Sequence, residues 1–119
     1  MGQLYKETPK QKEIVLVPVL FSNQKESKNR PAIILSKNEY NQKNEDILVV
    51  PLTTNLEERD YCISLSQNNL EKGILYYESK IRVDKINPIK QELIIMKIGL
   101  INDETLEKII NNLVNLLTQ

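Results

Sequence analysis

The sequence predicts a mainly β domain that is completed by one C-terminal α-helix. Three observations support this prediction: short runs rich in valine and isoleucine recur at intervals of about 10–15 residues, one of these runs alternates cleanly, and the end of the chain carries apolar residues at helical spacing. The 119 residues fit one domain. We expect residues 1–11, which are polar and lack any period, to form an N-terminal arm, and residues 12–119 to form the domain.

Three apolar runs are expected to form the first half of the sheet. Glu13–Phe21 is rich in β-branched residues, which favour a strand. Pro18 within this run indicates an edge or a bulge, because proline cannot donate to a ladder. Arg30–Ser36 and Asp46–Thr53 are the next two expected strands. The polar segments between the runs are expected to be loops: Ser22–Asn29 and Asn38–Glu45.

The remaining strands are shorter, and one helix follows them. Tyr61–Ser66 alternates with a period of two, Gly73–Ile86 is expected to be extended, and Glu92–Gly99 is the last expected strand. Asn102 is a suitable N-cap, with acidic residues behind it in the first turn. Apolar residues then recur on one helical face, which predicts a helix of about 16 residues docked on the sheet: Leu106, Ile109, Ile110, Leu113 and Leu117.

The composition excludes several kinds of chemistry. The chain has no histidine, the usual general base near neutral pH, so Ser-His-Asp and Cys-His nucleophile pairs and histidine-containing zinc sites are excluded. The single cysteine, Cys62, excludes an internal disulfide and thiolate metal centres. We therefore expect no metal and no cofactor. No apolar stretch reaches the ~18 residues of a membrane span, and we expect a cytoplasmic protein.

Net charge adds less information than composition. The 16 basic and 16 acidic residues cancel, which argues against a nucleic-acid binder that relies on bulk charge. The charges are unevenly distributed, however, and the segment from Lys6 to Arg30 carries more basic than acidic residues. A local basic face that binds nucleic acid is therefore still compatible with the sequence.

Arg30 is the first candidate for a functional side chain. It stands where a polar loop meets a strand, and Pro31 behind it favours extended backbone at Arg30. A guanidinium at such a junction can bind a phosphate group bidentately. The alternative is an ordinary surface arginine.

Other candidates lie near the ends of later strands. Thr53 and Thr54 carry hydroxyls that can hold phosphate oxygens, or that bond into the following turn with Asn55. Arg82 and Asp84 are two residues apart, so a strand would place them on one face. Such a pair is either a base positioned by a cation or a plain surface ion pair.

Taken together, these stretches resemble the MazF/PemK family of toxin–antitoxin endoribonucleases, and its PemK-like branch in particular. The resemblance extends from about Lys12 to Leu117 and rests on the order and spacing of its parts. The matching stretches, in order, are EIVLVPVLF, KNRPAIILS, DILVVPLTTN, GILYYESKIRVDKI, MKIG and the C-terminal amphipathic segment.

The resemblance implies a small barrel of the type shared with the CcdB gyrase poisons, with five to seven strands and an Src-homology-3-like form, which works as a homodimer. It also implies an enzyme that cleaves single-stranded RNA, or mRNA, at specific sequences without a metal. Such an enzyme leaves 2′,3′-cyclic phosphate and 5′-hydroxyl ends and inhibits translation and growth. A cognate antitoxin is the implied protein partner, and no membrane is involved.

The family's catalytic positions fall on four residues of this chain. The arginine of the Arg-Pro dipeptide is Arg30, the threonine that closes the third strand is Thr53, and the late arginine and aspartate are Arg82 and Asp84. We expect Asp84 to act as the base and Arg82 to orient it, while Arg30 and Thr53 hold the scissile phosphate. The expected RNA contacts are Lys25, Lys28, Ser36, Thr54 and Asn55.

Two alternatives stay open from sequence alone. One is a toxin-fold protein that has weak or no activity and binds a partner, which the balanced charge favours. The other is a gyrase poison of the CcdB type, against which the lack of tryptophan argues. One departure from the family also bears on the fold: relatives usually carry glycine before the acidic residue that opens the first strand, and here Lys12 stands in that place.

Overall fold

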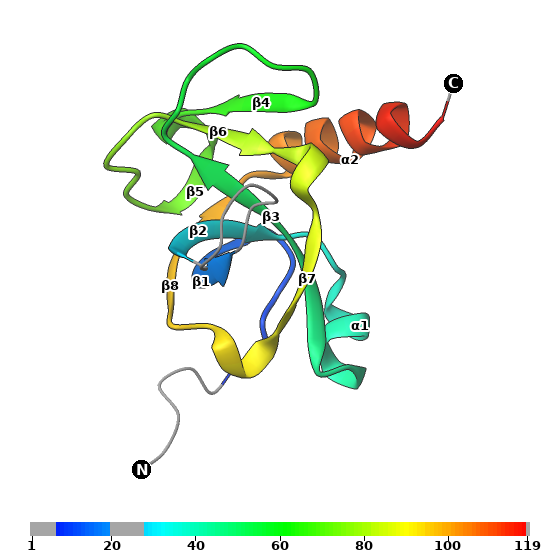
Figure 1. Ribbon diagram of the computed structural model, residues 1–119. Coiled ribbons are helices and arrows are strands. Elements are labelled where there is room, and N and C mark those ends of the chain that lie inside the picture. The colour runs from blue at the N-terminus through cyan, green and yellow to red at the C-terminus, as the bar shows by residue number, and fades with distance from the viewer. Residues whose placement is uncertain (1–6, 20–27, 119) are drawn as a thin grey trace.

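In a computed structural model, which describes residues 7–19 and 28–118, the chain forms a curled antiparallel sheet with a helix packed across one end (Figure 1). Among these residues eight strands form the sheet: β1 (Glu13–Val19), β2 (Lys28–Ile34), β3 (Asp46–Thr53), β4 (Cys62–Leu65), β5 (Leu70–Gly73), β6 (Ser79–Arg82), β7 (Asn87–Lys90) and β8 (Met96–Ile101). The helices are α1 (Asn38–Lys43) and α2 (Asp103–Leu117), with 3₁₀ turns at Gln67–Asn69, Val83–Lys85 and Gln91–Leu93. The predicted mainly β barrel with a C-terminal helix is confirmed.

The long strand β3 joins the two halves of the sheet. The neighbours follow the order β4-β6-β3-β2-β1-β8-β5, and β7 pairs with β3 outside this path. One edge of β3 pairs with β7 from Asp46 to Val49 and then with β6 at Leu52 and Thr53. Between those two pairings, at Val50 and Pro51, this edge of β3 changes partner. The other edge of β3 pairs with β2.

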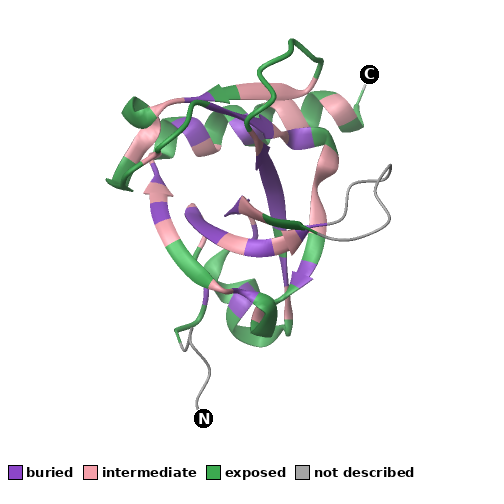
Figure 2. Ribbon diagram, turned by 60° about the vertical axis from the view of Figure 1, so that its left-hand side comes forward, coloured by how far each residue is buried: buried purple, intermediate pink, exposed green. Residues whose placement is uncertain are grey.

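Two buried clusters lie on opposite faces of this sheet, and Figure 2 shows buried residues along the strands and on α2. The first cluster takes alternate residues such as Val50, Leu52 and Ile81 and packs against α2 through Ile109. The second cluster contains residues at the intervening positions of the strands. They include Val15, Val17, Ala32, Ile34, Ile47 and Val49. Because both faces of β3 are buried, its sequence is a nearly continuous apolar run with little alternation.

The C-terminal helix begins as the sequence predicts. The Asn102 side chain accepts a hydrogen bond from the Thr105 backbone N–H at 2.8 Å, which caps the first turn. The predicted apolar stripe is only partly used, however. Ile109 is fully buried, whereas Ile110 and Leu117 are 43% and 74% exposed. The helix therefore docks through a narrower face than the stripe predicts.

The prediction of a loop over Asn38–Glu45 is wrong, because Asn38–Lys43 forms the short helix α1. Its buried residue Asn41 explains the difference. The Asn41 side chain accepts a hydrogen bond from the Ser36 hydroxyl at 2.6 Å and donates to the Pro9 carbonyl at 3.0 Å. The Pro9 contact comes from 32 residues away, and polar contacts of this kind leave no apolar period to detect. They also tie the end of the expected N-terminal arm to the domain.

Two backbone details concern the first strand. Pro18 lies beyond the last pair between β1 and β8, Leu16 with Met96, so β1 is an edge strand at that point, as predicted. The bulge lies elsewhere, between Ile14 and Val15. Lys12, where relatives usually carry glycine, has a φ of 81°. The left-handed turn that glycine adopts most readily is thus formed here by a lysine.

Candidate functional site

Strand register places Arg30 and Thr53 on the same face of the sheet. Arg30 in β2 alternates with Ala32 and Ile34, which belong to the second cluster, so its side chain leaves the sheet on that side. Thr53 in β3 alternates with Val49 in the same way. The last pair of the β2–β3 ladder is Ala32 with Pro51. If that register is continued by two residues, backward along β2 and forward along β3, Arg30 lies opposite Thr53.

The next strands extend this row of polar side chains. Thr53 is paired with Lys80 of β6, and Lys80 is paired in turn with Ser64 of β4. Arg82 lies two residues beyond Lys80 and is paired with Cys62. Residues that are directly opposite in an antiparallel pair share a face. We call this set the polar face: Lys28, Arg30, Thr53, Cys62, Ser64, Lys80 and Arg82.

Arg82 and Asp84 form a two-point ion pair. The Arg82 Nε donates to Asp84 Oδ1 at 3.0 Å and Nη2 donates to Oδ2 at 2.9 Å. Their geometry differs from the predicted one, in which both residues lie on one strand. Strand β6 ends at Arg82, and the 3₁₀ turn Val83–Lys85 folds the carboxylate back onto the guanidinium. The turn therefore creates a close contact that an extended strand would not make.

This pair fixes the charge state of both groups. The hydrogen bonds from the Arg82 guanidinium hold the pKa of the Asp84 carboxyl below its usual value, against the opposing effect of partial burial. The same bonds raise the pKa of Arg82. Asp84 is thus a carboxylate at neutral pH, and its basicity is reduced.

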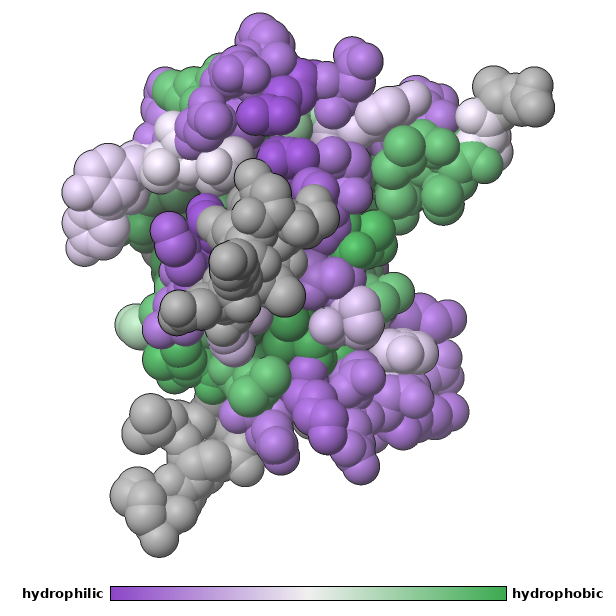
Figure 3. Space-filling view, in the orientation of Figure 1, coloured by the Kyte–Doolittle hydropathy of each residue, from purple (hydrophilic) through white to green (hydrophobic). Residues whose placement is uncertain are grey.

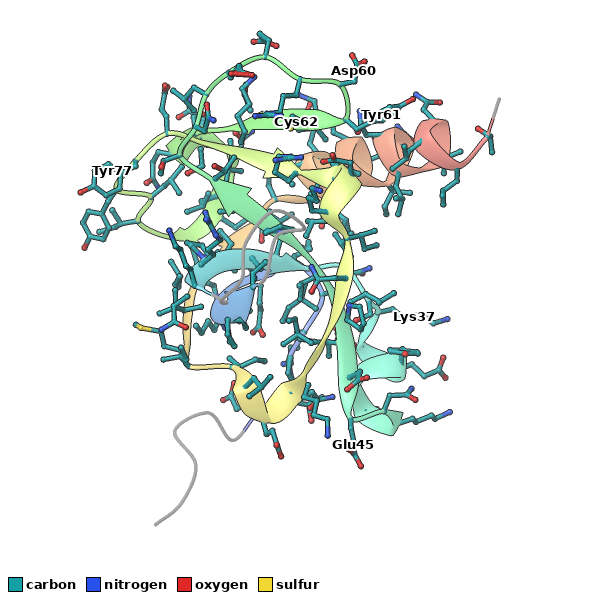
Figure 4. The ribbon with its side chains drawn as sticks, viewed as in Figure 1. Lys37, Glu45, Asp60, Tyr61, Cys62 and Tyr77 are labelled. Atoms are coloured by element: carbon teal, nitrogen blue, oxygen red, sulfur yellow. The ribbon has the colours of Figure 1, made fainter. Side chains whose placement is uncertain are left out.

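The neighbouring thiol of Cys62 has a different environment. Burial raises its pKa, and the nearby Arg82 charge only partly offsets that effect. Cys62 therefore stays protonated and is not an activated nucleophile. In Figure 4, Tyr61 and Cys62 lie where the loop that follows β3 enters β4, with Asp60 at the turn of that loop.

Thr53 takes part in the turn that leaves the sheet. Its Oγ1 accepts a hydrogen bond from the Asn55 backbone N–H at 3.1 Å, and the Asn55 side chain accepts one from the Glu57 N–H at 3.0 Å. This is the turn-forming interpretation that the sequence left open for Thr53 and Asn55. The Thr53 hydroxyl accepts in this bond and can still donate its proton outward.

The other expected RNA contacts are placed differently from one another. Lys28 is exposed on the polar face, and Thr54 is exposed just beyond Thr53. Lys25 lies outside the described residues. Ser36 is buried, and its hydroxyl accepts a hydrogen bond from the Leu48 N–H at 3.0 Å while donating to α1.

Ser36 is therefore separated from the site by the length of β2. At about 3.3 Å per residue, it lies some six residues, or roughly 20 Å, along the chain from Arg30. Its hydroxyl secures α1 to β3. We leave Ser36 out of the site on these grounds.

Lys80 is a charged residue of the polar face that is not among the candidates predicted from the sequence. It is 6% exposed, and its Nζ lies 3.1 Å from Glu58 Oε2 in the loop between β3 and β4. A signal for it was present, because Lys80 and Arg82 alternate around Ile81 in the segment SKIR. Arg30 is half-buried, with its Nε atom enclosed.

The surface around the site is hydrophilic. Figure 3 shows polar side chains gathered over β4 and the loop before it, while apolar side chains gather over the outer part of α2. A cavity of about 390 Å³ opens at this end and is lined by residues that include Glu58, Ser64, Lys80 and Lys108. A larger cavity of about 450 Å³ lies at the opposite end, beside α1 and Lys90–Glu92. It contains no residue of the polar face.

Two kinds of feature are absent from the described residues. Among them, no group of three or more histidine, cysteine, aspartate or glutamate side chains could hold a metal ion. No helix in the described part of the chain is long and apolar enough to cross a membrane.

Comparison with known proteins identifies similar folds. A family model described as the PemK-like, MazF-like toxin of type II toxin–antitoxin systems matches residues 10–117. No curated protein matches the sequence. Among solved structures, MazF from Deinococcus radiodurans superposes with a TM-score of 0.76 at 16% identity, covering 94% of this chain and 98% of that one.

Two mycobacterial structures superpose with slightly lower scores. One is an endoribonuclease in complex with its cognate antitoxin, with a TM-score of 0.72 at 17% identity, covering 92% of this chain and 94% of that one. The other is the Mycobacterium tuberculosis toxin MazF-mt6, with a TM-score of 0.72 at 17% identity, covering 88% of this chain and 95% of that one. At these identities the superpositions establish a shared fold.

Proposed function

The chain belongs to the PemK-like, MazF-like toxins of type II toxin–antitoxin systems, and we propose that it is a metal-independent, sequence-specific endoribonuclease that cleaves single-stranded RNA and so inhibits translation and growth. The observation that carries this proposal is the strand register, which gives Arg30, Thr53 and Arg82 a common sheet face. Guanidinium and hydroxyl groups on one face suit the phosphates of an RNA strand.

The proposed reaction is attack of a ribose 2′-hydroxyl on the adjacent phosphorus. The new bond to phosphorus forms as the bond to the 5′ oxygen breaks, which leaves a 2′,3′-cyclic phosphate and a 5′-hydroxyl. Asp84 accepts the proton of the 2′-hydroxyl, and Arg82 holds the Asp84 carboxylate in place. Arg30 and Thr53 bind the scissile phosphate and stabilise the charge that develops on its oxygens. Arg30 keeps an electrostatic role in this scheme, and the leaving oxygen takes its proton from water.

The charge state of Asp84 predicts a slow enzyme. General bases work best when their pKa lies near the working pH. The Arg82 contact lowers the pKa of Asp84, so the base is fully ionised but weak. A toxin that cleaves messenger RNA needs only modest turnover to stop growth, so this cost is compatible with the proposed role.

The proposed partners follow from the same surfaces. An antitoxin that carries an acidic segment would bind the polar face and compete with RNA, since both ligands are anionic. We further propose a homodimer. It is supported by the exposed apolar side chains on the outer side of α2, at positions Ile110, Val114 and Leu117. The proposed location is the cytoplasm, where messenger RNA is translated.

The test is cleavage of single-stranded RNA by the purified protein in excess EDTA. We expect cutting with cyclic-phosphate ends in the wild type and none in Arg30→Ala, with an unchanged unfolding temperature. Lys90→Ala is the control, because Lys90 is an exposed cation beside the cavity at the opposite end of the molecule. Cutting that requires a divalent metal, or full activity in Arg30→Ala, would contradict the proposal. A folded protein that neither cuts RNA nor arrests growth would indicate a partner-binding role instead.

A further inference from the structure

Lys80 is a buried cation in the middle of the polar face. Its side chain is 7% exposed, and lysine is almost never this buried unless its ammonium group is paired. The partner is Glu58, whose side chain is 92% exposed and whose Oε2 lies 3.1 Å from Lys80 Nζ. A buried cation is thus covered by an acid from an exposed loop.

The surroundings of Lys80 are those of an anion site. Thr53 and Ser64 lie directly opposite Lys80 on the two flanking strands, so hydroxyl-bearing side chains stand on either side of the lysine. Arg82 follows two residues later on the same face. A lysine ammonium between hydroxyl donors, next to a guanidinium, matches the groups that bind phosphate oxygens.

The cavity beside Lys80 gives an anion room to enter. It measures about 390 Å³ and is lined by two lysines, Lys80 and Lys108, by two glutamates, Glu58 and Glu78, and by Ser64 among others. While Glu58 lies in the cavity, its two positive and two negative charges cancel. Moving Glu58 out of this cavity would leave a net positive charge next to the row that contains Thr53 and Arg82.

We propose that Lys80 is a further phosphate-binding residue of the RNA site, and that Glu58 occupies this position until an RNA phosphate displaces it. The inference rests on the proposed ribonuclease function. The contact can open because an ion pair with one exposed partner is weak and is screened by salt. The loop that carries Glu58 has no helix or strand between Thr53 and Cys62, so its displacement breaks no regular structure.

The experiment measures binding of a labelled, single-stranded 2′-O-methyl RNA of mixed sequence by fluorescence anisotropy. This probe lacks the attacking hydroxyl and stays intact. Glu58→Gln removes the competing charge, and we expect the Kd to fall about two- to fivefold, the range of a weak ion pair. Glu57→Gln is the matched control, because it removes the same charge one residue away, from a side chain that contacts Arg59 rather than Lys80. Its Kd should change by less than about 1.5-fold, since a solvent-exposed charge away from the ligand is screened.

A second variant tests Lys80 directly. Lys80→Met keeps an unbranched apolar side chain and removes the ammonium group. We expect the Kd to rise about tenfold and the slope of the salt dependence of binding to fall by about 0.7, the amount for one phosphate contact on single-stranded RNA. In the double variant Lys80→Met/Glu58→Gln, the gain from removing Glu58 should vanish. Thermal unfolding checks that Lys80→Met is folded. If Lys80→Met does not fold, the comparison of Glu58→Gln with Glu57→Gln still tests the inference.

Three results would overturn the inference: no tightening in Glu58→Gln, equal tightening in Glu57→Gln, or tightening that persists without Lys80. These outcomes are separate from a failure of the proposed function. If the wild type cleaves unmodified RNA and Glu58→Gln binds the probe like the wild type, only the inference fails. If the wild type cleaves no RNA, the proposed function fails whatever the Kd values are.

Discussion

Replacing Asp84 by asparagine removes the negative charge of the Arg82–Asp84 pair while keeping a side chain of nearly the same size and shape. The asparagine oxygen can still accept from Arg82 Nε, whereas the second, charge-assisted bond from Nη2 at 2.9 Å is lost. The Arg82 side chain is only 13% exposed and Asp84 is 32% exposed, so the pair is intermediate between surface pairs worth about 0–1 kcal/mol and buried pairs whose disruption costs about 3–5 kcal/mol. We expect Asp84→Asn to lower the free energy of unfolding by about 1–2 kcal/mol.

The pH dependence of this loss tests its electrostatic origin. Asp84 has a lower pKa in the folded protein than in the unfolded chain, where it is about 3.8. Its contribution to stability is therefore fully present above that pH and is lost as the pH falls through the folded pKa. Urea unfolding of both proteins at pH 7 and at successively lower pH should show a difference that shrinks below pH 3.8. A difference that is the same at pH 7 and at pH 2 would refute this reasoning.

The same variant separates two roles for Asp84 in cleavage. If Asp84 is the base, kcat should fall about 100-fold or more while KM changes little. If the carboxylate only holds Arg82 against the phosphate, KM should rise and kcat should fall less. Single-turnover cleavage with excess enzyme distinguishes the two, because it measures the chemical step without product release. A variant with wild-type kcat and KM would remove Asp84 from the site.

Three other predictions follow from features described above. Because the pKa of Asp84 is lowered and the chain has no histidine, kcat/KM should show no acidic limb between pH 5 and 7 in a profile of cleavage rates; an inflection in that range would assign the base to another group. Gly99→Ala would bring a Cβ within 2.7 Å of the Lys72 carbonyl oxygen, where β5 meets β8. We therefore expect the free energy of unfolding, measured by urea titration, to fall by about 1–3 kcal/mol. A free energy of unfolding within about 0.5 kcal/mol of the wild type would show that β5 shifts to accommodate the methyl group. Val114→Asp places a charge in the exposed apolar side of α2 and should convert the proposed dimer to a monomer in sedimentation experiments; an unchanged mass would locate the interface elsewhere.

The parts of the fold that sequence predicts well are those with a local physical cause. Strand β3 spans Asp46–Thr53, the predicted residues, because a β-branched apolar run buried on both faces has few alternatives. Asn102 caps α2 because its side chain reaches the Thr105 N–H within one turn. Helix α1 was missed for the opposite reason. It depends on the burial of Asn41 against Ser36 and Pro9, which only the folded chain brings together.

In the candidate site, too, features with a local cause could be predicted and features that depend on distant contacts could not. Arg30 and Thr53 were selected because the sequence predicts a strand that begins at Arg30 and one that ends at Thr53; the second boundary is confirmed, whereas β2 begins two residues earlier, at Lys28. The contact between Arg82 and Asp84 was expected, but its form was not, since the 3₁₀ turn after β6 has no marker in the sequence. Lys80 was within reach of simple alternation. What alternation cannot provide is its partner, because Glu58 is 22 residues away and comes from a loop without a period.

The change of partner along one edge of β3 has a geometric consequence. Arg30 is carried by the β1–β2 side of the molecule, and Lys80 and Arg82 are carried by the β4–β6 side, with β3 as the common strand. Because β3 pairs with β2 at Pro51 and with β6 at Thr53, two ladders on one strand set the spacing between the Arg30 side and the Lys80 side. An RNA strand bound along the polar face would therefore contact both ladders at once.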